Sequence, residues 1–456
     1  MNKRVPMRGS VVFLSVLAVA ALVSGCNLPK HGSILFDIDL EPLEAAYGAL
    51  KGDIPAITGA TVTLFQDEAD TIVQDLAVSG GHATGTVNDL AEGYWHVKVD
   101  VYSGAAKIFT GEQDVNVIAG LVVNATILFD PVVENPETGS IAFEVGLNPV
   151  PGYRFLDQAA NTVLYSAVRD EIYFYDAEQC LIAVHNGETF NRVRDIEMPQ
   201  APRALCLAAD GNTFVLGYTT GQVYSLGVDT GEFTLLGDAL MDVRMLAAIT
   251  PDCVLAVGPG SSSGSALKTF NTATGQILAS QSVFYSFQDI VYNTGTNTAY
   301  AFTTGVSPAD LYRIKLDPAT GAILEAKDSR YHGDYNFGAP VRLIRGGQRV
   351  ATSSGNMFSC TALTDTDITY AGNIGQTYAD LAADDALGYL SLVTLAATGA
   401  PAKLIIVRQD NFFVVATVDL PGKPKSVINT AANVVVTVEF NGQYYAKAFS
   451  KAFLGL

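Results

Sequence analysis

The stretch Asp289–Ala326 (DIVYNTGTNTAYAFTTGVSPADLYRIKLDPATGAILEA) contains four short apolar runs separated by polar turns. The runs are Asp289–Tyr292, Asn297–Phe302, Leu311–Leu316 and Ala322–Ala326. Runs of this length that are rich in Ile, Val and Tyr and are bounded by Gly, Pro, Asn or Asp are typical of β-strands. The stretch therefore predicts a unit of four consecutive strands, with a D/N-x-x-T-G turn before the fourth.

The same unit repeats along the C-terminal part of the chain. Its first strands are expected to begin near Val163, Ala204, Val243, Asp289, Val341, Ala379 and Ser426. Repeats of about 40 to 50 residues with four strands each are typical of β-propeller blades. A blade packs both of its faces against neighbouring blades, which agrees with apolar residues on both sides of each strand. The sequence therefore predicts a seven-bladed β-propeller over residues 139–456.

The seventh copy is incomplete. It contains the runs Ser426–Asn429, Asn433–Glu439 and Gln443–Ala448 and lacks a fourth strand. An unpaired strand before the first copy, either Ser140–Gly146 or Gly152–Leu156, could supply it. Such pairing would close the ring and remove two open sheet edges, which otherwise promote aggregation.

Through its D/N-x-x-T-G turns, this region resembles the YVTN and quinoprotein-like propellers of exported bacterial proteins. The resemblance implies the fold and no particular activity. Trp95 is the only tryptophan, so the docking tryptophans of quinone-cofactor propellers, the S-x-D-x-G-x-x-W boxes of sialidases and the tryptophan–aspartate repeat signature are all missing. We therefore expect no cofactor, and no propeller enzyme class is supported.

Seven further runs with period-two alternation precede the repeats. They are Ser33–Asp39, Ala60–Gln66, Thr71–Ala77, Ala83–Asn88, Tyr94–Tyr102, Lys107–Val117 and Leu121–Phe129. Seven short strands in about a hundred residues predict a small β-sandwich over residues 32–131. A Pro/Glu-rich linker at residues 132–138 follows and predicts few contacts between the two parts. The whole chain is thus expected to be all-β.

Three segments of the sandwich region carry a resemblance. Thr58–Leu64 (TGATVTL), Leu90–Val99 (LAEGYWHVKV) and Val117–Gly120 (VIAG) resemble the carboxypeptidase-regulatory, transthyretin-like domains of exported bacterial proteins, which have an Ig-like sandwich. The resemblance implies a spacer or presentation module and says little about function.

The first 26 residues predict export and lipid anchoring. Lys3, Arg4 and Arg8 precede the apolar run Val11–Val23, as in a secretory signal, and this run is too short to span a hydrocarbon core of about 30 Å. The segment Val23-Ser24-Gly25-Cys26 resembles the bacterial lipobox. That resemblance implies that residues 1–25 are removed, that Cys26 takes palmitate or similar acyl chains, and that residues 26–31 form a tether.

The residue after Cys26 is Asn27 rather than Asp, which favours the outer membrane, facing either the periplasm or the cell surface. The alternative is an ordinary signal peptide with an incidental cysteine. We therefore expect a lipid-anchored protein of the bacterial cell envelope.

Composition and spacing exclude several classes of function. The net charge of −19 and the absence of a basic stripe argue against nucleic-acid binding. No metal-ligand spacing, nucleophile–base pair or phosphate loop is recognisable, so we assign no catalytic residue and no metal site. The remaining cysteines are expected to be buried small residues, although an exported protein could pair them in three ways. They are Cys180, Cys206, Cys253 and Cys360.

One loop stands out as a candidate binding site. The segment Ser329–Gly338 (SRYHGDYNFG) connects the fourth and fifth repeats and should emerge on the same face of the propeller as Thr303–Asp310 and Pro259–Ser265. Its rings could either cap the rim of the propeller or contact a protein or glycan ligand. The candidate residues are Arg330, Tyr331, His332, Asp334, Tyr335 and Phe337.

Two functions are compatible with these features. The first is a lipid-anchored envelope protein that presents its propeller as a non-enzymatic binding or scaffold module. The second is a propeller enzyme, a lyase or hydrolase, acting on an envelope or extracellular polymer. Paired acids and a histidine that converge over the central channel would favour the enzyme, and scattered ones would favour the scaffold.

Overall fold

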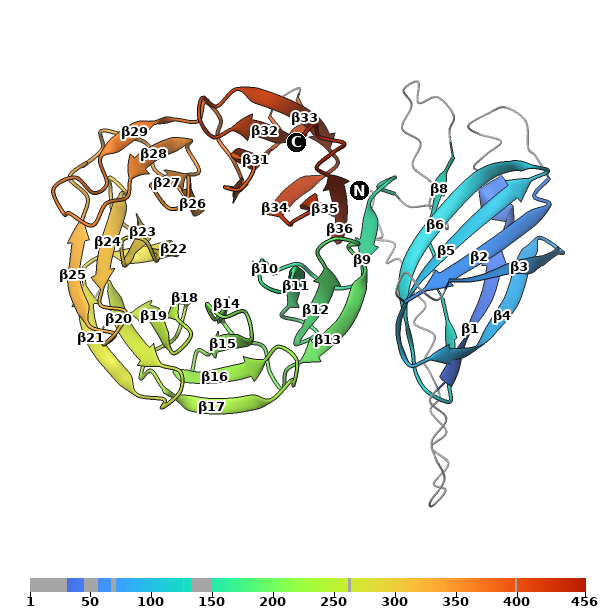
Figure 1. The fold of residues 1–456 in the computed structure, drawn as a ribbon, viewed down its shortest axis with the longest axis horizontal. Coiled ribbons are helices and arrows are strands. Elements are labelled where there is room, and N and C mark those ends of the chain that lie inside the picture. The colour runs from blue at the N-terminus through green and yellow to red at the C-terminus, as the bar shows by residue number, and fades with distance from the viewer. Residues whose placement is uncertain are drawn as a thin grey trace, which may run out of the picture.

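The structure is a computed structural model. It describes residues 31–44, 56–66, 71–125, 127–132, 149–260, 264–397 and 400–456. The chain is all-β and has two parts, a curved N-terminal sheet and a ring of seven four-stranded sheets (Figure 1). The predicted signal peptide, Cys26 and most of the linker lie outside the described residues. Within the described ranges, no helix is long and apolar enough to cross a membrane.

The ring is a seven-bladed β-propeller in which consecutive strands pair antiparallel within each blade. Blades one and two comprise β10 (Thr162–Ser166), β11 (Glu171–Asp176), β12 (Leu181–Asn186), β13 (Arg192–Glu197), β14 (Ala204–Leu207), β15 (Thr213–Gly217), β16 (Gln222–Gly227) and β17 (Phe233–Asp238). Blades three and four comprise β18 (Met245–Thr250), β19 (Cys253–Pro259), β20 (Ser265–Asn271), β21 (Ile277–Val283), β22 (Ser286–Asn293), β23 (Thr298–Thr304), β24 (Leu311–Leu316) and β25 (Ile323–Asp328). Blades five and six comprise β26 (Val341–Ile344), β27 (Arg349–Thr352), β28 (Asn356–Ser359), β29 (Tyr370–Asn373), β30 (Asp380–Asp384), β31 (Tyr389–Thr394), β32 (Ala402–Arg408) and β33 (Val414–Leu420). Each predicted first strand begins within three residues of the observed one, so the repeat assignment is confirmed.

The seventh blade is completed by a strand from the front of the propeller. Its strands are β34 (Lys423–Asn429), β35 (Asn433–Phe440), β36 (Gln443–Ser450) and β9 (Arg154–Leu156), in that order. β9 pairs antiparallel with β36. The predicted ring closure by residues 152–156 is therefore confirmed, whereas the other candidate strand, residues 140–146, lies outside the described residues.

The propeller core lies between neighbouring blades. The middle strands are buried on both faces, as in β35, whose first six residues are all buried. Leu255 and Leu267 of blade three pack in one cluster with Ala299 and Ile314 of blade four. Because such strands contact a blade on each side, their sequences are nearly continuous apolar runs, which accounts for the clarity of the repeat.

The N-terminal part is a single eight-stranded sheet. Its order is β7-β1-β4-β3-β2-β5-β6-β8. The strands are β1 (His31–Asp39), β2 (Gly59–Phe65), β3 (Ile72–Ser79), β4 (His82–Ala91), β5 (Gly93–Ser103), β6 (Ala106–Val117), β7 (Val122–Asn124) and β8 (Phe129–Pro131). The predicted run Leu121–Phe129 is divided between β7, which pairs with β1, and β8, which pairs with β6.

Two halves of this sheet fold over a common core. β3 joins them, because Ile72–Leu76 pairs with β2 and Ala77–Ser79 pairs with β4. Ile34 of β1 is fully buried in the same cluster as Val97 of β5. The structure thus shows one curved sheet with two facing halves, and it does not show the two separate sheets expected for the sandwich.

Candidate functional site

The predicted binding loop lies between β25 and β26, on the same face of the propeller as the loop between β23 and β24. The two loops meet, because the Ser329 hydroxyl donates a hydrogen bond of 2.6 Å to Asp310 Oδ1. The Asp310 backbone N–H is in turn held by Thr303 Oγ1 at 2.7 Å. Residues that are far apart in the repeat therefore form one surface above blade four.

The aromatic residues of the loop pack against the propeller. Tyr331, Tyr335 and Phe337 all contact the ring of Phe358, which is fully buried. Tyr335 also stacks on Tyr370, with ring centroids 4.3 Å apart. The three rings therefore close the rim between blades four and five, which is the first of the two roles considered for them.

The other three residues of the loop keep exposed side chains. Arg330 donates a hydrogen bond through Nη2 to the backbone oxygen of Asp365. Asp334 Oδ2 accepts a hydrogen bond from the His332 backbone N–H at 3.2 Å. The imidazole of His332 is 65% exposed and faces two carboxylates of the neighbouring strands.

Asp310, Asp328 and His332 form an acid–histidine cluster. Nδ1 of His332 lies 3.7 Å from Oδ2 of Asp310 and 4.0 Å from Oδ2 of Asp328. Asp310 is only 2% exposed, and burial raises the pKa of its carboxyl to about 6, although hydrogen bonds from Ser329 and Leu311 oppose the change. Sequence reasoning singled out His332 but neither acid, because the cluster arises from the ends of two strands and from a loop.

A cavity of about 430 Å³ lies between blades four and five and borders this cluster. Its charged lining residues are Arg313, Lys327, Asp328, Arg330, Asp365 and Asp367. Buried charged groups normally have hydrogen-bond partners. Arg313 is an exception, because it is 2% exposed and none of its three guanidinium nitrogens has a hydrogen-bond partner among the described residues. Its nearest anion is Asp367, with Oδ2 at 3.3 Å from Nη1.

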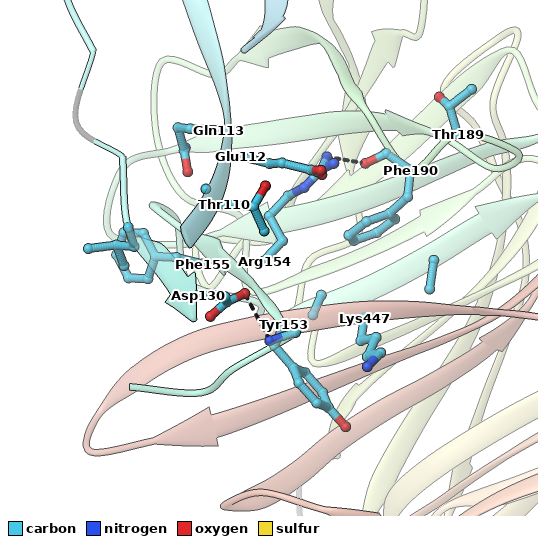
Figure 2. Close-up of a pocket in the computed structure, with 15 residues that line it drawn as sticks. Thr110, Glu112, Gln113, Asp130, Tyr153, Arg154, Phe155, Thr189, Phe190 and Lys447 are labelled. Atoms are coloured by element: carbon cyan, nitrogen blue, oxygen red, sulfur yellow. Dashed lines mark hydrogen bonds between the residues drawn. The ribbon is translucent and has the colours of Figure 1, made fainter. Parts of the chain in front are cut away.

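A second cavity, of about 350 Å³, lies at the junction between the N-terminal sheet and the propeller (Figure 2). Figure 2 shows Arg154 extending past Glu112, where its Nη1 donates a hydrogen bond of 2.6 Å to the backbone oxygen of Phe190. Asp130 accepts a hydrogen bond from the Gly152 backbone N–H at 3.0 Å. Several polar groups around this cavity thus hold the two parts of the chain together.

Asp114 is the centre of the junction. Its Oδ2 accepts hydrogen bonds from Arg154 Nη1 at 3.0 Å and from the Arg192 backbone N–H at 2.8 Å. Its Oδ1 lies 2.8 Å from His96 Nδ1. Burial alone would raise the pKa of Asp114, but the Arg154 charge and the His96 hydrogen bond outweigh it and hold the pKa at about 2.

A second contact reinforces the junction. The Tyr94 hydroxyl donates a hydrogen bond of 2.5 Å to Asp195, and the Arg192 guanidinium lies 5.0 Å from the centre of the Tyr94 ring. β5 and β6 thereby lie against β13 and β9 (Figure 1). The two parts are in closer contact than the composition of the linker predicts.

The comparisons with known proteins do not assign the chain to a family. No protein-family model matches the chain, and no curated protein sequence is significantly similar to it. One similar solved structure is the β-propeller domain of Cps50 (Swd1) from Myceliophteria thermophila, with 11% identity, a TM-score of 0.48, and coverage of 65% of this chain and 98% of that one. Another is hydrazine synthase from Kuenenia stuttgartiensis, with 13% identity, a TM-score of 0.48, and coverage of 69% and 100%. These similarities concern the fold alone.

Proposed function

We propose that this chain is a lipid-anchored protein of the bacterial cell envelope, held in the outer membrane by acyl chains on Cys26. We further propose that its propeller is a non-enzymatic binding module. The lipobox-like residues Val23–Cys26 support the anchor. The propeller supports the binding role, because its loops from separate blades form shared surfaces. The observation that carries the proposal is the polar cavity between blades four and five.

The cavity favours an anionic group on a protein or glycan ligand. Lys327 and Arg330 are exposed at its wall beside three carboxylates, those of Asp328, Asp365 and Asp367. Arg313 lies behind this wall, and its buried guanidinium nitrogens have no hydrogen-bond partner among the described residues. Local cations attract anionic ligands even when the net charge of the protein is −19. An Arg guanidinium also matches the geometry of a carboxylate or sulfate, to which it can donate two parallel hydrogen bonds.

The N-terminal sheet acts in this proposal as a transthyretin-like presentation module. Asp114 and Tyr94 connect it to the propeller through partly buried hydrogen bonds. The tether at residues 26–31 would join the acyl anchor directly to β1. The propeller would then be held at a fixed orientation relative to the module rather than moving freely on a linker.

An array of acidic and neutral glycans and peptides tests the binding function. The full chain, purified in detergent, should retain acidic members, and the double variant Lys327→Ala/Arg330→Ala should bind them at least about tenfold more weakly. Lys403→Ala is a matched control, because Lys403 is a partly exposed lysine of blade six that pairs with Asp419 away from the cavity. If the chain retains no acidic member of the array, or if the double variant binds acidic members as tightly as the wild type does, this function is refuted.

A second candidate function, a propeller hydrolase or lyase acting on a polymer, is favoured by one observation. Two acids and a histidine do converge, in Asp310, Asp328 and His332. They lie above the outer half of blade four, because Asp328 ends the outermost strand β25, and not over the central channel (Figure 1). Release of reducing or unsaturated ends from an acidic polysaccharide, abolished by Asp310→Asn, would establish this alternative.

A further inference from the structure

The acid–histidine cluster provides three ligand atoms of the kinds that bind metal ions. Asp310, Asp328 and His332 each offer one such atom, and all three atoms lie within 4.8 Å of one another. Asp310 Oδ2 is buried and has no hydrogen-bond partner among the described residues. An ionised buried oxygen without a partner is unfavourable, so a cation at this position would satisfy it.

Ser329 orients both carboxylates toward the same point. Its hydroxyl donates to Asp310 Oδ1 at 2.6 Å, and its backbone N–H donates to Asp328 Oδ1 at 3.0 Å. Asp310 Oδ1 is also held by the Leu311 backbone N–H at 2.7 Å. The Oδ2 atom of each carboxylate is thereby directed to the side on which His332 Nδ1 lies. Hydrogen bonds of this kind, made to the atom that does not bind the metal, orient the ligands of metal sites.

From this geometry we propose that Asp310, Asp328 and His332 bind one divalent transition-metal ion, such as Zn²⁺, on the loop face of blade four. The imidazole favours Zn²⁺ and similar ions over Ca²⁺ and Mg²⁺, which prefer oxygen ligands alone. Three protein ligands leave a fourth position open for water or for a ligand atom. Since Asp328 also lines the 430 Å³ cavity, the ion would lie beside the proposed binding site.

The observed spacing is close to that of a tetrahedral site. Zinc bonds of about 2.0 to 2.1 Å place the ligand atoms roughly 3.3 Å apart. The histidine nitrogen is 3.7 and 4.0 Å from the two carboxylate oxygens. His332 is exposed and lies on a loop, so its side chain can make the movement of about 0.4 to 0.7 Å that would bring its nitrogen to that distance from both oxygens. The two carboxylate oxygens, which lie within 4.8 Å of each other, would also have to approach the ion.

Titration calorimetry with Zn²⁺ on the full chain, purified in detergent and stripped with a chelator, tests this inference. We expect one Zn²⁺ per chain, and a Co²⁺ derivative with the strong visible absorption of four-coordinate cobalt. His332→Ala and Asp310→Asn should each abolish the stoichiometric binding, and Ser329→Ala should weaken it by about 10- to 100-fold. His332→Ala should fold normally, because the side chain is exposed.

The control is His82→Ala, which removes an exposed histidine whose Nδ1 lies 2.8 Å from Asp37, a carboxylate that is itself exposed. This variant should bind Zn²⁺ as the wild type does. Substoichiometric binding, or binding that survives both His332→Ala and Asp310→Asn, would overturn the proposal and leave His332 only as an ion-pair partner of the two acids. Lys327→Ala/Arg330→Ala should keep the Zn²⁺ site, so failure of the binding function and failure of the metal site are distinguishable.

Discussion

Phe155 of β9 lies opposite Tyr445 of β36, and the centres of their rings are 5.6 Å apart. The two residues come from the front and the back of the propeller sequence and meet in one blade. Their pairing gives the seventh blade its fourth strand, so the outer edge of β36 is covered and the front and back of the propeller sequence are joined in one sheet. All loop surfaces of the propeller, including that of blade four, depend on this closure.

We expect Phe155→Ala to destabilise the propeller by about 2 to 4 kcal/mol, because it removes a ring that packs on both Tyr445 and the blade core. Denaturant unfolding of the full chain measures the change. Leu324→Ala is the control, since Leu324 lies on the outer strand β25 and is 60% exposed. If both variants change stability by less than about 0.5 kcal/mol, β9 does not hold the ring closed.

The propeller repeat could be predicted from the sequence because each blade contains a recognisable pattern of strands and turns within its own residues. The strand–turn pattern of residues 289–326 recurs at a regular period, and the apolar runs follow from burial on both faces. The incomplete seventh copy predicted the closing strand by the same reasoning.

Other features could not be predicted, because they depend on contacts between distant residues. β3 contributes its two ends to different halves of the N-terminal sheet, and no local pattern encodes that division. Asp114 and Arg154 meet across the junction, although the Pro/Glu-rich linker suggested separate parts. Asp310 and Asp328 come together only because two strands of blade four end on the same face.

Removing the Asp114 carboxylate should weaken the junction. Asp114→Ala leaves Arg154 without its ion-pair partner in a mostly buried position, a change that typically costs about 3 to 5 kcal/mol. We expect limited proteolysis to cleave this variant between the two parts faster than the wild type. Asp75→Ala is the control, since Asp75 is an exposed acid of β3 that accepts a hydrogen bond from Thr61 within the N-terminal sheet. Equal cleavage of the two variants would show that Asp114 does not hold the parts together.

The stability of the junction should also depend on pH. The pKa of Asp114 is about 2 in the folded protein and lies below its usual 3.8, so its stabilising effect is present above about pH 4 and is lost as the pH falls toward 2. Burial would lower the pKa of His96, but the hydrogen bonds of His96 with Asp114 and Glu112 outweigh it and raise the pKa above its usual 6.5. The stabilising effect of protonated His96 is therefore fully present below about pH 6.5 and is lost as the pH rises through the pKa of the folded state. Thermal melting between pH 2 and pH 8 should therefore show a maximum between about pH 4 and 6.5. Asp114→Asn should flatten the acid side of the curve, and an unchanged curve would contradict the assignment.

The cysteines should be free thiols that react only after unfolding. Burial raises the pKa of Cys206 to about 12, of Cys253 to about 11 and of Cys360 to about 12. Only Cys180 is partly exposed, and all four are unpaired. A thiol reagent should modify Cys180 alone in the folded protein and all four positions in denaturant, as mapped by mass spectrometry. Failure to modify the denatured, unreduced protein would instead indicate disulfides.

Lipid anchoring should depend on Cys26 alone. Cys26→Ala removes the proposed acyl acceptor, so the variant should not incorporate labelled palmitate and should be released from the membrane fraction. Cys180→Ala, which removes a partly exposed cysteine of the propeller, should behave as the wild type. Membrane retention of the Cys26→Ala protein would show that the cysteine is incidental and that another element holds the chain.

A ligand that carries an anionic group should bind in the cavity between blades four and five. Hydrogen–deuterium exchange of the full chain, with and without an acidic ligand selected from the array, tests it most directly. We predict slower exchange confined to the cavity walls around residues 323–330 and 361–368, and no such change in Lys327→Ala/Arg330→Ala. Protection at the junction cavity instead, around residues 110–113, 152–155 and 446–448, or no ligand-dependent protection at all, would contradict the account.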